Sequence, residues 1–146
     1  MAEDVRIDYD NGYYVGAVAE DGTTEHGLGM FMWNNGESYV GYFENGVRTG
    51  RGTFRWPDGR VYEGEFRDDV RTGKGTFRWP AGDVYTGDFV DGTFCGIGKM
   101  VWANGEVYEG GFKDGKMEGI GVLYAPDGSV TYSGEWIQGC PVSAGE

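Results

Sequence analysis

The side chains that most often carry out catalysis or hold metals are few in this chain. The only histidine, His26, lies in a polar stretch, where a lone histidine is usually unreactive. No group of His and Cys residues has the spacing of a metal site. Asp8 and Asp10 begin like a calcium-binding loop, but the third acid and the glycine at the sixth position are missing, so we interpret the segment as a turn.

Gly-x-Gly pairs, which can cradle phosphate, recur along the chain but lack the strand-to-helix context that a phosphate loop needs. Acidic residues are plentiful, yet none stands in an apolar setting that would raise its pKa for acid–base work. We therefore predict no catalytic residues, no metal, no cofactor and no enzyme activity.

Cys95 and Cys140 fall in predicted loops at the same end of their hairpins, four strands apart. At about 4.8 Å per strand they would lie ~19 Å apart, far beyond the ~7 Å that a disulfide allows between Cα atoms. We expect two free thiols and a reducing compartment. The sequence shows neither a transmembrane span nor a signal peptide, so we expect a cytoplasmic protein.

The chain consists of internal repeats, and these repeats determine where all of the residues above are placed. The Gly-x-Gly pairs that begin at Gly27, Gly50, Gly73, Gly96 and Gly119 recur every 23 residues. Tyr-x-Gly pairs recur between them, so that a sequence such as 62–84 is the unit of the chain. A fixed period in the range of about 20 to 50 residues predicts a repeat architecture. We predict an array over 1–139, with half repeats at 4–18 and 131–139, regular repeats over 27–128 and a flexible tail at 140–146.

The residue pattern predicts an all-β fold without a helix of useful length. Apolar and polar residues alternate in short segments between turn signals such as Asn-Gly and Asp-Gly, which is the pattern of strands. The predicted strands are 4–9, 13–18, 28–33, 38–43, 51–56, 61–66, 74–79, 84–89, 97–102, 107–112, 120–125 and 131–136. Strands joined by short loops are antiparallel neighbours, so we predict a single-layer, elongated and twisted β-meander of about twelve strands with unpaired edges at both ends.

Alternation places the aromatic rings and the glycines on one face. We expect Tyr62 to lie opposite Phe77 and Trp56, Gly64 opposite Gly75 and Phe54, and Phe66 opposite Gly73 and Gly52. In this register each ring has bare glycine backbone beside it.

Taken one by one, the rings are expected to form the core of the repeats. Taken together, they are expected to be more than a single layer without a covering helix can bury, so that some lie exposed in a groove, and exposed apolar patches usually bind a partner. The predicted partner-binding groove consists of Trp33, Tyr39, Phe43, Phe54, Trp56, Tyr62, Phe66, Phe77, Trp79, Tyr85, Phe89, Trp102, Tyr108 and Phe112.

The opposite face alternates charged residues in the middle of the chain and becomes apolar toward the carboxyl end. This apolar surface suggests a homodimer. The residues of the possible dimer face are Ile97, Val101, Val107, Ile120, Val122 and Tyr124.

The net charge is −12, and it is unevenly distributed: −8 over residues 1–47, +3 over 48–78 and −7 over 79–146. An acidic surface disfavours nucleic acid and anionic membranes, which bind through Lys and Arg. The charge is explained either by solubility alone or by a basic partner.

The string Tyr-x-Gly-x-Phe-x-x-Gly-x-x-x-Gly-x-Gly resembles the MORN (membrane occupation and recognition nexus) repeat, and 39–52 and 108–121 match it best. Asp69, where other repeats have glycine, departs from the pattern, as do Met100, Leu123 and Ala125. The resemblance covers about 13–139 and implies an elongated β-hairpin array, found beside enzyme domains, in junctional membrane proteins and as repeat-only chains in cytoskeletal and axonemal assemblies.

Three functions remain open. The preferred one is a structural adaptor of the repeat-only type, associated with the cytoskeleton or a cilium, whose groove binds a peptide or helix with apolar anchors and basic flanks. The second is a membrane tether that binds anionic phospholipid through the basic stretch 48–78, which the total charge opposes. The third is a regulatory subunit of a separate enzyme.

Overall fold

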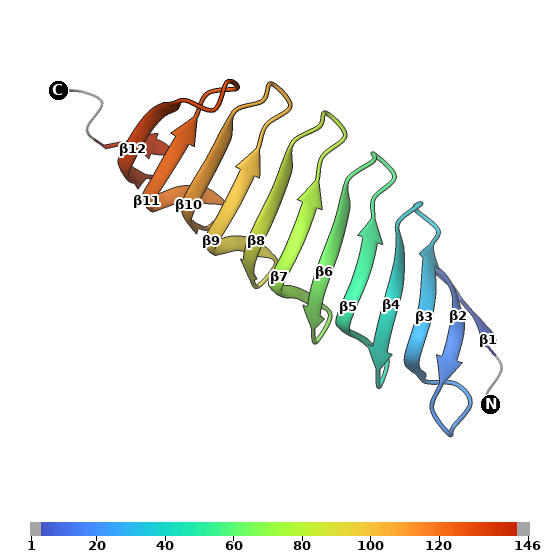
Figure 1. Cartoon of the computed structure of the whole chain (residues 1–146). Coiled ribbons are helices and arrows are strands. Elements are labelled where there is room, and N and C mark those ends of the chain that lie inside the picture. Colours follow the sequence, from blue (N-terminus) through green and yellow to red (C-terminus); the bar gives the residue numbers. More distant parts are fainter. Residues whose placement is uncertain (1–3, 143–146) are drawn as a thin grey trace.

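The computed structural model describes residues 4–142, which form one antiparallel sheet in which each strand pairs with the next along the chain (Figure 1). The strands are β1 (Val5–Tyr9), β2 (Gly12–Val18), β3 (Glu25–Trp33), β4 (Ser38–Glu44), β5 (Val47–Arg55), β6 (Val61–Arg67), β7 (Val70–Arg78), β8 (Val84–Val90), β9 (Thr93–Val101), β10 (Val107–Lys113), β11 (Lys116–Tyr124), β12 (Val130–Ile137) and β13 (Cys140–Pro141). The predicted all-β, single-layer meander is confirmed. The described residues include no helix that could cross a membrane.

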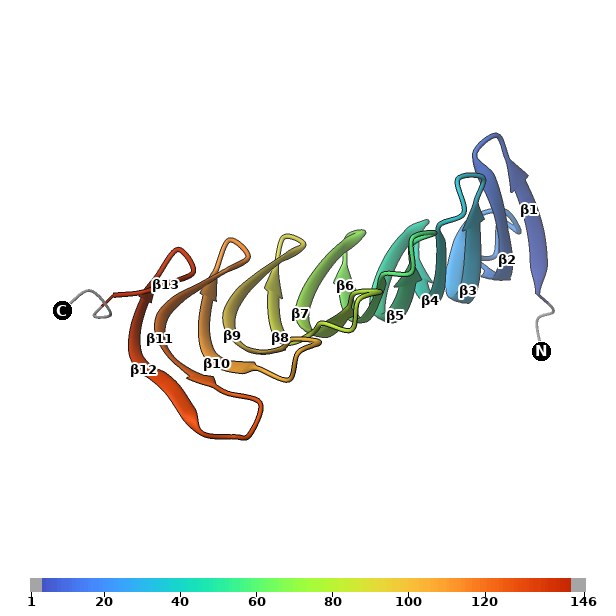
Figure 2. The same ribbon diagram turned by 90° about the horizontal axis from the view of Figure 1, so that it is seen from above.

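The sheet is a long row of hairpins, and each hairpin is strongly curved (Figures 1 and 2). One face of the sheet, which we call the ring face, carries the Tyr, Phe and Trp side chains that form the hydrophobic core. The opposite face, which we call the outer face, carries the charged residues of the alternating pattern. Because no second layer covers the sheet, its core consists of rings packed along the array.

The core is a zipper of tyrosine and phenylalanine rings. Tyr62 contacts Phe66 of its own strand and Phe89 of the next repeat, with ring centroids 5.2 and 5.0 Å apart and ring planes 90° and 82° apart. Edge-to-face contacts of this kind stabilise aromatic pairs beyond the area that they bury. The same arrangement continues from Tyr14 to Trp136, so that every repeat is joined to its neighbour through ring contacts.

The hydrogen bond of the hydroxyl group explains why the Tyr62 position of each repeat is tyrosine and not phenylalanine. Tyr62 donates a hydrogen bond of 2.8 Å to the backbone carbonyl of Glu65, three residues later, and Tyr85 does the same to Asp88 at 2.8 Å. The register shifts at this point of each hairpin, between Gly64 and Glu65 in β6. A buried carbonyl that loses its ladder partner needs another donor, and the hydroxyl is that donor.

The two glycines of each Gly-x-Gly pair have different roles. The second one, Gly75 in β7, forms the bare surface on which Tyr62 lies, because a Cβ atom there would be 2.6 Å from the Cε1 and the hydroxyl oxygen of Tyr62. The first one, Gly73, has φ +63°, a left-handed conformation that glycine adopts without strain. It begins a β-bulge in which β7 has two more residues than β6 between Gly64↔Gly75 and Glu65↔Thr72.

The predicted register across the shorter turns is wrong by two residues. Tyr62 lies opposite Phe54, not opposite Trp56. Trp56 belongs to the turn, where its N–H donates to the Arg60 carbonyl and its own carbonyl accepts from the Gly59 N–H. Because the error is an even number of residues, every side chain stays on its predicted face.

Across the longer loops, the predicted pairs Tyr62↔Phe77 and Gly64↔Gly75 are confirmed. The predicted register is wrong closer to the loop. Phe66 lies opposite Arg71, not opposite Gly73, because the loop is a tight turn at Asp68–Asp69 and β7 begins at Val70. The strands that follow these turns are therefore longer than predicted.

Residues 140 and 141, which we expected to lie in a flexible tail, form β13 and pair with Ile137 and Trp136 of β12. Cys140 therefore lies in β13 and Cys95 in β9, and neither is in a disulfide. Residues 143–146 of the predicted tail lie outside the described residues.

Candidate functional site

Most of the predicted groove is the interior of the array. The expectation that these rings lie open in a groove is wrong for the residues whose exposed fraction is 8% or less, although Phe54, Phe66 and Phe77 still contribute to the walls of pockets. The buried residues of the predicted groove are Tyr39, Phe43, Phe54, Tyr62, Phe66, Phe77, Tyr85, Phe89, Tyr108 and Phe112. Curvature of the hairpins and the close fit of rings onto glycine bury them without a second layer.

The four tryptophans of the predicted groove, Trp33, Trp56, Trp79 and Trp102, are partly exposed. Trp56 stands between Phe54 and Phe77, with centroids 4.5 and 5.3 Å apart, in a second row of tilted rings. Because each tryptophan lies next to a short turn at the border of the ring face, it presents one side to the core and the other to solvent.

Sequence reasoning missed a position on the ring face that differs from repeat to repeat. It lies two residues before the first glycine of each Gly-x-Gly pair, and we call it the cover position because its side chain lies over the rings. Its occupants are Glu25, Arg48, Arg71, Phe94 and Met117. The period of 23 could have revealed it, but we assigned these residues to loops.

Phe94 shows most clearly where the cover position lies. Its ring stacks on Tyr85 at 4.2 Å and 14°, and it contacts Trp79 at 5.7 Å edge-on. In the same place one repeat earlier, the Arg71 guanidinium lies over the rings of Trp56, Tyr62 and Phe77 at 5.6, 5.7 and 5.6 Å. A cation at this distance from a ring face is attracted by its quadrupole.

Arg48 occupies the cover position of the preceding repeat and is held by Asp69. The Arg48 Nε donates to the Asp69 carboxylate at 3.1 Å, and a terminal NH₂ group donates to the Asp69 carbonyl at 2.9 Å. The same carboxylate also accepts from the Arg48 backbone N–H at 2.7 Å. Asp69 thus fixes this arginine and neutralises its charge.

Asp69 departs from the other repeats in a conformation that favours glycine. It has φ +70°, and the corresponding residues of three other hairpins are Gly46, Gly92 and Gly115, with φ of 85°, 82° and 82°. A non-glycine residue in this region is strained by about 1 kcal/mol. The hydrogen bonds that Asp69 makes to Arg48 act against that strain.

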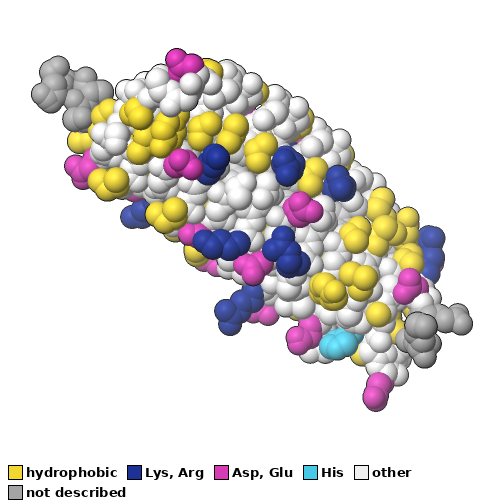
Figure 3. Space-filling view, viewed as in Figure 1, with side chains coloured by type: hydrophobic (Ala, Val, Ile, Leu, Met, Phe, Trp, Pro, Cys, Tyr) yellow, Lys and Arg dark blue, Asp and Glu magenta, His cyan; other side chains and the backbone are white. Residues whose placement is uncertain are grey.

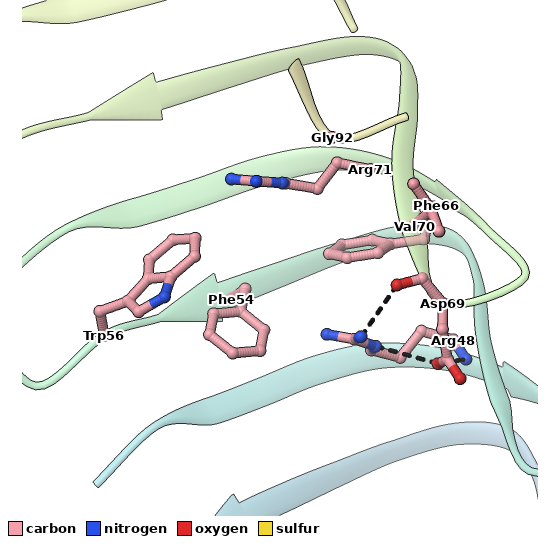
Figure 4. Close-up of a pocket in the computed structure, with 8 residues that line it drawn as sticks. All are labelled: Arg48, Phe54, Trp56, Phe66, Asp69, Val70, Arg71 and Gly92. Carbon is pink, nitrogen blue, oxygen red and sulfur yellow. Dashed lines mark hydrogen bonds and ion pairs between the residues drawn. The ribbon is translucent and has the colours of Figure 1, made fainter. Parts of the chain in front are cut away.

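Two pockets of about 230 and 270 Å³ adjoin each other on the ring face, and Arg71 and Gly92 belong to both. Figure 4 shows the first of them. The first is also lined by Arg48, Phe54, Trp56, Phe66, Asp69 and Val70, and the second by Arg60, Phe77, Trp79, Thr93, Phe94 and Gly115. Aromatic walls around a guanidinium suit a ligand that is both apolar and acidic.

The cover position of the first full repeat has the opposite charge. Glu25 is 9% exposed, and its carboxylate accepts a hydrogen bond from the Tyr9 hydroxyl. This hydrogen bond, together with burial, raises the pKa of Tyr9 to about 12. Along the ring face the cover positions therefore change from acidic to basic to apolar.

The six residues of the possible dimer face lie on the outer face, where Val107 stands between Val101 and Tyr124 on its two neighbouring strands. Ile97 and Ile120 expose 66% and 69% of their surface. Sequence reasoning missed a second apolar area at the amino-terminal end, where exposed Leu28 and Tyr42 lie opposite each other. Hydrophobic side chains gather at both ends of the view in Figure 3, with charged side chains between them.

The basic stretch 48–78 does not form one surface. Arg48 and Arg71 lie on the ring face, whereas Arg51 is exposed on the outer face opposite Glu65. Lys74 is paired with Asp88. A membrane-binding patch needs several cations on one side, and here acids stand among them.

The carboxylates with resolved pKa shifts are set to stay ionised. A hydrogen bond from Lys74 and one from the Ile97 N–H lower the pKa of Asp88, and local turn hydrogen bonds lower the pKa of Asp21, Asp58 and Asp127. Within residues 4–142 no group of three His, Cys, Asp or Glu side chains could hold a metal ion. The four carboxylates with lowered pKa values therefore contribute negative charge to the surface.

Comparison with protein-family models finds the MORN repeat at residues 25–38, 39–59, 62–84, 85–107 and 108–130. No curated protein matches the sequence. Among solved structures, the chain is similar to the TCP domain of SAS-4 (dCPAP) from Drosophila melanogaster in complex with a proline-rich motif of Ana2 (dSTIL), at 11% identity, with 86% of this chain and 80% of that chain covered and a TM-score of 0.44.

A second similar structure is the wild-type TCP10 domain of CPAP from Danio rerio in complex with a peptide of STIL. It is 14% identical, with 90% of this chain and 67% of that chain covered and a TM-score of 0.30. Scores this low carry no inference about function.

Proposed function

Because this chain belongs to the MORN repeat family, we propose that it is a non-catalytic adaptor whose ring face holds a segment of a partner protein. The partly exposed tryptophans and the pair of pockets around Arg71 form the contact surface. The ten buried rings of the predicted groove support that surface from below.

The observation that carries this proposal is the combination of open pockets and aromatic walls on the ring face. Trp56 and Trp79 line neighbouring pockets that share Arg71. Tryptophan and arginine are the residues that most often dominate the binding energy of protein interfaces. A regular row of such side chains suits a long, narrow ligand such as a helix or an extended segment.

The charge of the chain indicates the flanks of the partner. Residues 1–47 have a net charge of −8, and their cover position holds Glu25, so a segment that extends from the pockets toward β1 approaches the acidic end of the array. Basic residues on that side of the segment would be attracted, and nucleic acid would be repelled. The interleaved acids and bases of the outer face make a lipid surface the weaker candidate.

The test compares capture of partner proteins from the native cell by the wild-type chain and by a Trp56→Ala/Trp79→Ala variant. We expect the variant to keep its β-sheet circular dichroism and to lose the captured protein. A Leu28→Ala/Tyr42→Ala variant, altered on the outer face, is the control and should capture normally. Loss of capture in the control and retention in the tryptophan variant would refute the assignment to the ring face.

A homodimer through the apolar carboxyl-end part of the outer face is a second proposal. Ile97 and Ile120, the most exposed large apolar residues there, would be its centre. Light scattering at high micromolar concentration should give twice the chain mass, and Ile97→Glu should return the mass to that of one chain. A monomeric wild type would refute the dimer. The proposed cytoskeletal or ciliary setting rests on the family resemblance alone.

A further inference from the structure

Of the two arginines at cover positions, Arg48 has a carboxylate partner, whereas Arg71 has none among residues 4–142. Its guanidinium is partly buried over Trp56, Tyr62 and Phe77, and among residues 4–142 no carboxylate forms an ion pair with it. Arg60, which lines the same pocket, is paired with Asp58 at 2.8 Å. In Figure 4 the dashed lines join Arg48 to Asp69, and none reaches Arg71.

The preceding repeat shows what is missing at Arg71. Arg48 lies in the same place and is held by the Asp69 carboxylate of the following turn. The turn that follows Arg71 has Gly92 in that place, where an added Cβ would lie 3.4 Å from a terminal nitrogen of Arg71. A carboxylate supplied from outside could therefore approach Arg71 from the side on which Asp69 approaches Arg48.

The surroundings of Arg71 make such a ligand favourable. Burial, and then the charges of Arg48 and Arg60, lower the pKa of Arg71. A guanidinium that has lost part of its water gains more from a carboxylate than an exposed one does, because the interaction is less screened. The surrounding rings exclude water from the pair once a ligand covers them.

We propose that Arg71 is the specificity-determining residue of the ring face and that it binds an Asp or Glu side chain of the partner segment. This proposal rests on the proposed function, since it names the chemistry that the bound segment must have. Apolar side chains on either side of the acid rest against Trp56 in one pocket and against Trp79 and Phe94 in the other. One guanidinium matches one carboxylate in a planar, two-bond geometry.

A carboxylate fits this place better than a phosphate group. A doubly charged phosphate is usually held by several cations, whereas Arg48 and Arg60 already have Asp69 and Asp58 as partners. The net charge of −12 also repels a polyanionic surface. A single acid among apolar residues avoids both costs.

The repeat also defines the spacing of the acid from its apolar neighbours. Successive cover positions are two strands apart, or about 10 Å at ~4.8 Å per strand. An extended segment covers that distance in about three residues and a helix in about seven. An apolar residue at that spacing toward β9 would meet Phe94 when the acid meets Arg71.

The test begins with a display library of random 20-residue peptides, selected separately on the wild-type chain and on Arg71→Phe. Phenylalanine is the natural occupant of the next cover position, at Phe94, so this variant keeps the packing and removes the charge. We expect peptides from the wild type, but not from Arg71→Phe, to be enriched in one Asp or Glu between apolar residues.

Selected peptides are then synthesised and their affinity is measured. Arg71→Phe should weaken binding by about 10- to 100-fold, the range for a hydrogen-bonded charge pair. Arg55→Gln, which removes the same charge from an exposed site on the outer face, should change it less than about 2-fold. Asp69→Gly, which frees Arg48, should strengthen binding. A peptide whose acid is replaced by its amide should bind wild type and Arg71→Phe equally.

Three outcomes would overturn the proposal. Peptides that bind the ring face with no acid, and equally well to both proteins, would refute the role of Arg71 and leave the adaptor function standing. A library that yields no peptide for either protein would count against both. Binding to phosphatidylserine vesicles that depends on Arg71, without any selected peptide, would assign the residue to a lipid headgroup instead.

Discussion

The close approach of Tyr62 to Gly75 makes a sharp prediction about stability. In Gly75→Ala the new Cβ would lie 2.6 Å from the Cε1 and hydroxyl oxygen of Tyr62 and 2.8 Å from its Cζ. The ring cannot move away freely, because Phe66 and Phe89 hold it at 5.2 and 5.0 Å and its hydroxyl donates to the Glu65 carbonyl.

The magnitude follows from three effects. Overpacking of a well-packed core costs about 1–3 kcal/mol, and loss of the tyrosine hydrogen bond adds about 1 kcal/mol. Alanine restricts the unfolded chain, which returns about 0.4–1 kcal/mol. We expect the free energy of unfolding to fall by about 2–3 kcal/mol, measured by urea denaturation followed by far-ultraviolet circular dichroism.

Two further variants test the cause. Gly128→Ala has φ +90° and no atom near the new Cβ, so it should cost only the left-handed strain of about 1 kcal/mol. In a Tyr62→Leu background the penalty of Gly75→Ala should fall below about 1 kcal/mol, because the ring that it meets is absent. A penalty no larger than that of Gly128→Ala, or one unchanged by Tyr62→Leu, would refute the reasoning.

Three other predictions concern hydrogen bonds and protonation. Tyr85→Phe leaves the Asp88 carbonyl without its 2.8 Å hydroxyl donor and should lower the free energy of unfolding by about 1–2 kcal/mol in urea titrations, whereas Tyr13→Phe should have little effect. Burial raises the pKa of Tyr39 to about 12, so its stabilising contribution is complete below pH 10 and lost as the pH rises through 12; tyrosinate absorbance should rise together with loss of the sheet signal. The hydrogen bond from Lys74 lowers the pKa of Asp88 below 3.8, so its contribution is present above that pH and lost on acidification; Asp88→Asn should flatten the acid dependence of the melting temperature, and an unchanged slope would contradict this.

The sequence was sufficient to predict the repeat array, because the residue patterns that indicate strands and turns recur in every repeat. The spacing of 23 residues, the strand alternation and the short turns predict the meander and the face on which Tyr62 and Phe66 lie. The register was wrong by an even number of residues, since Trp56 could equally end a strand or belong to a turn by its type. An even error exchanges neighbours without exchanging faces, so the set of core residues was unaffected.

The number of rings that the single layer buries could not be predicted, because it depends on how strongly the hairpins curve. Glycine can provide either room for a ring or a left-handed φ. The residue type alone does not show that Gly75 has the first role and Gly73 the second. Only the bulge at Gly73, seen in the structure, shows that the strand continues before it and includes residues 70–72. For that reason the sequence pattern predicts a loop at Arg71, although this residue lies over the rings at the centre of the candidate site.

The cover position separates what makes the array stable from what it can recognise. The zipper of Tyr and Phe rings depends only on contacts between adjacent repeats, so a whole repeat could be duplicated, removed or exchanged while those contacts are rebuilt at each junction. Such a rearrangement would move Arg71 by about 10 Å relative to Glu25, one repeat length, without a new fold having to form. A chain built in this way can acquire a new order of charges through recombination of its gene while its core stays the same.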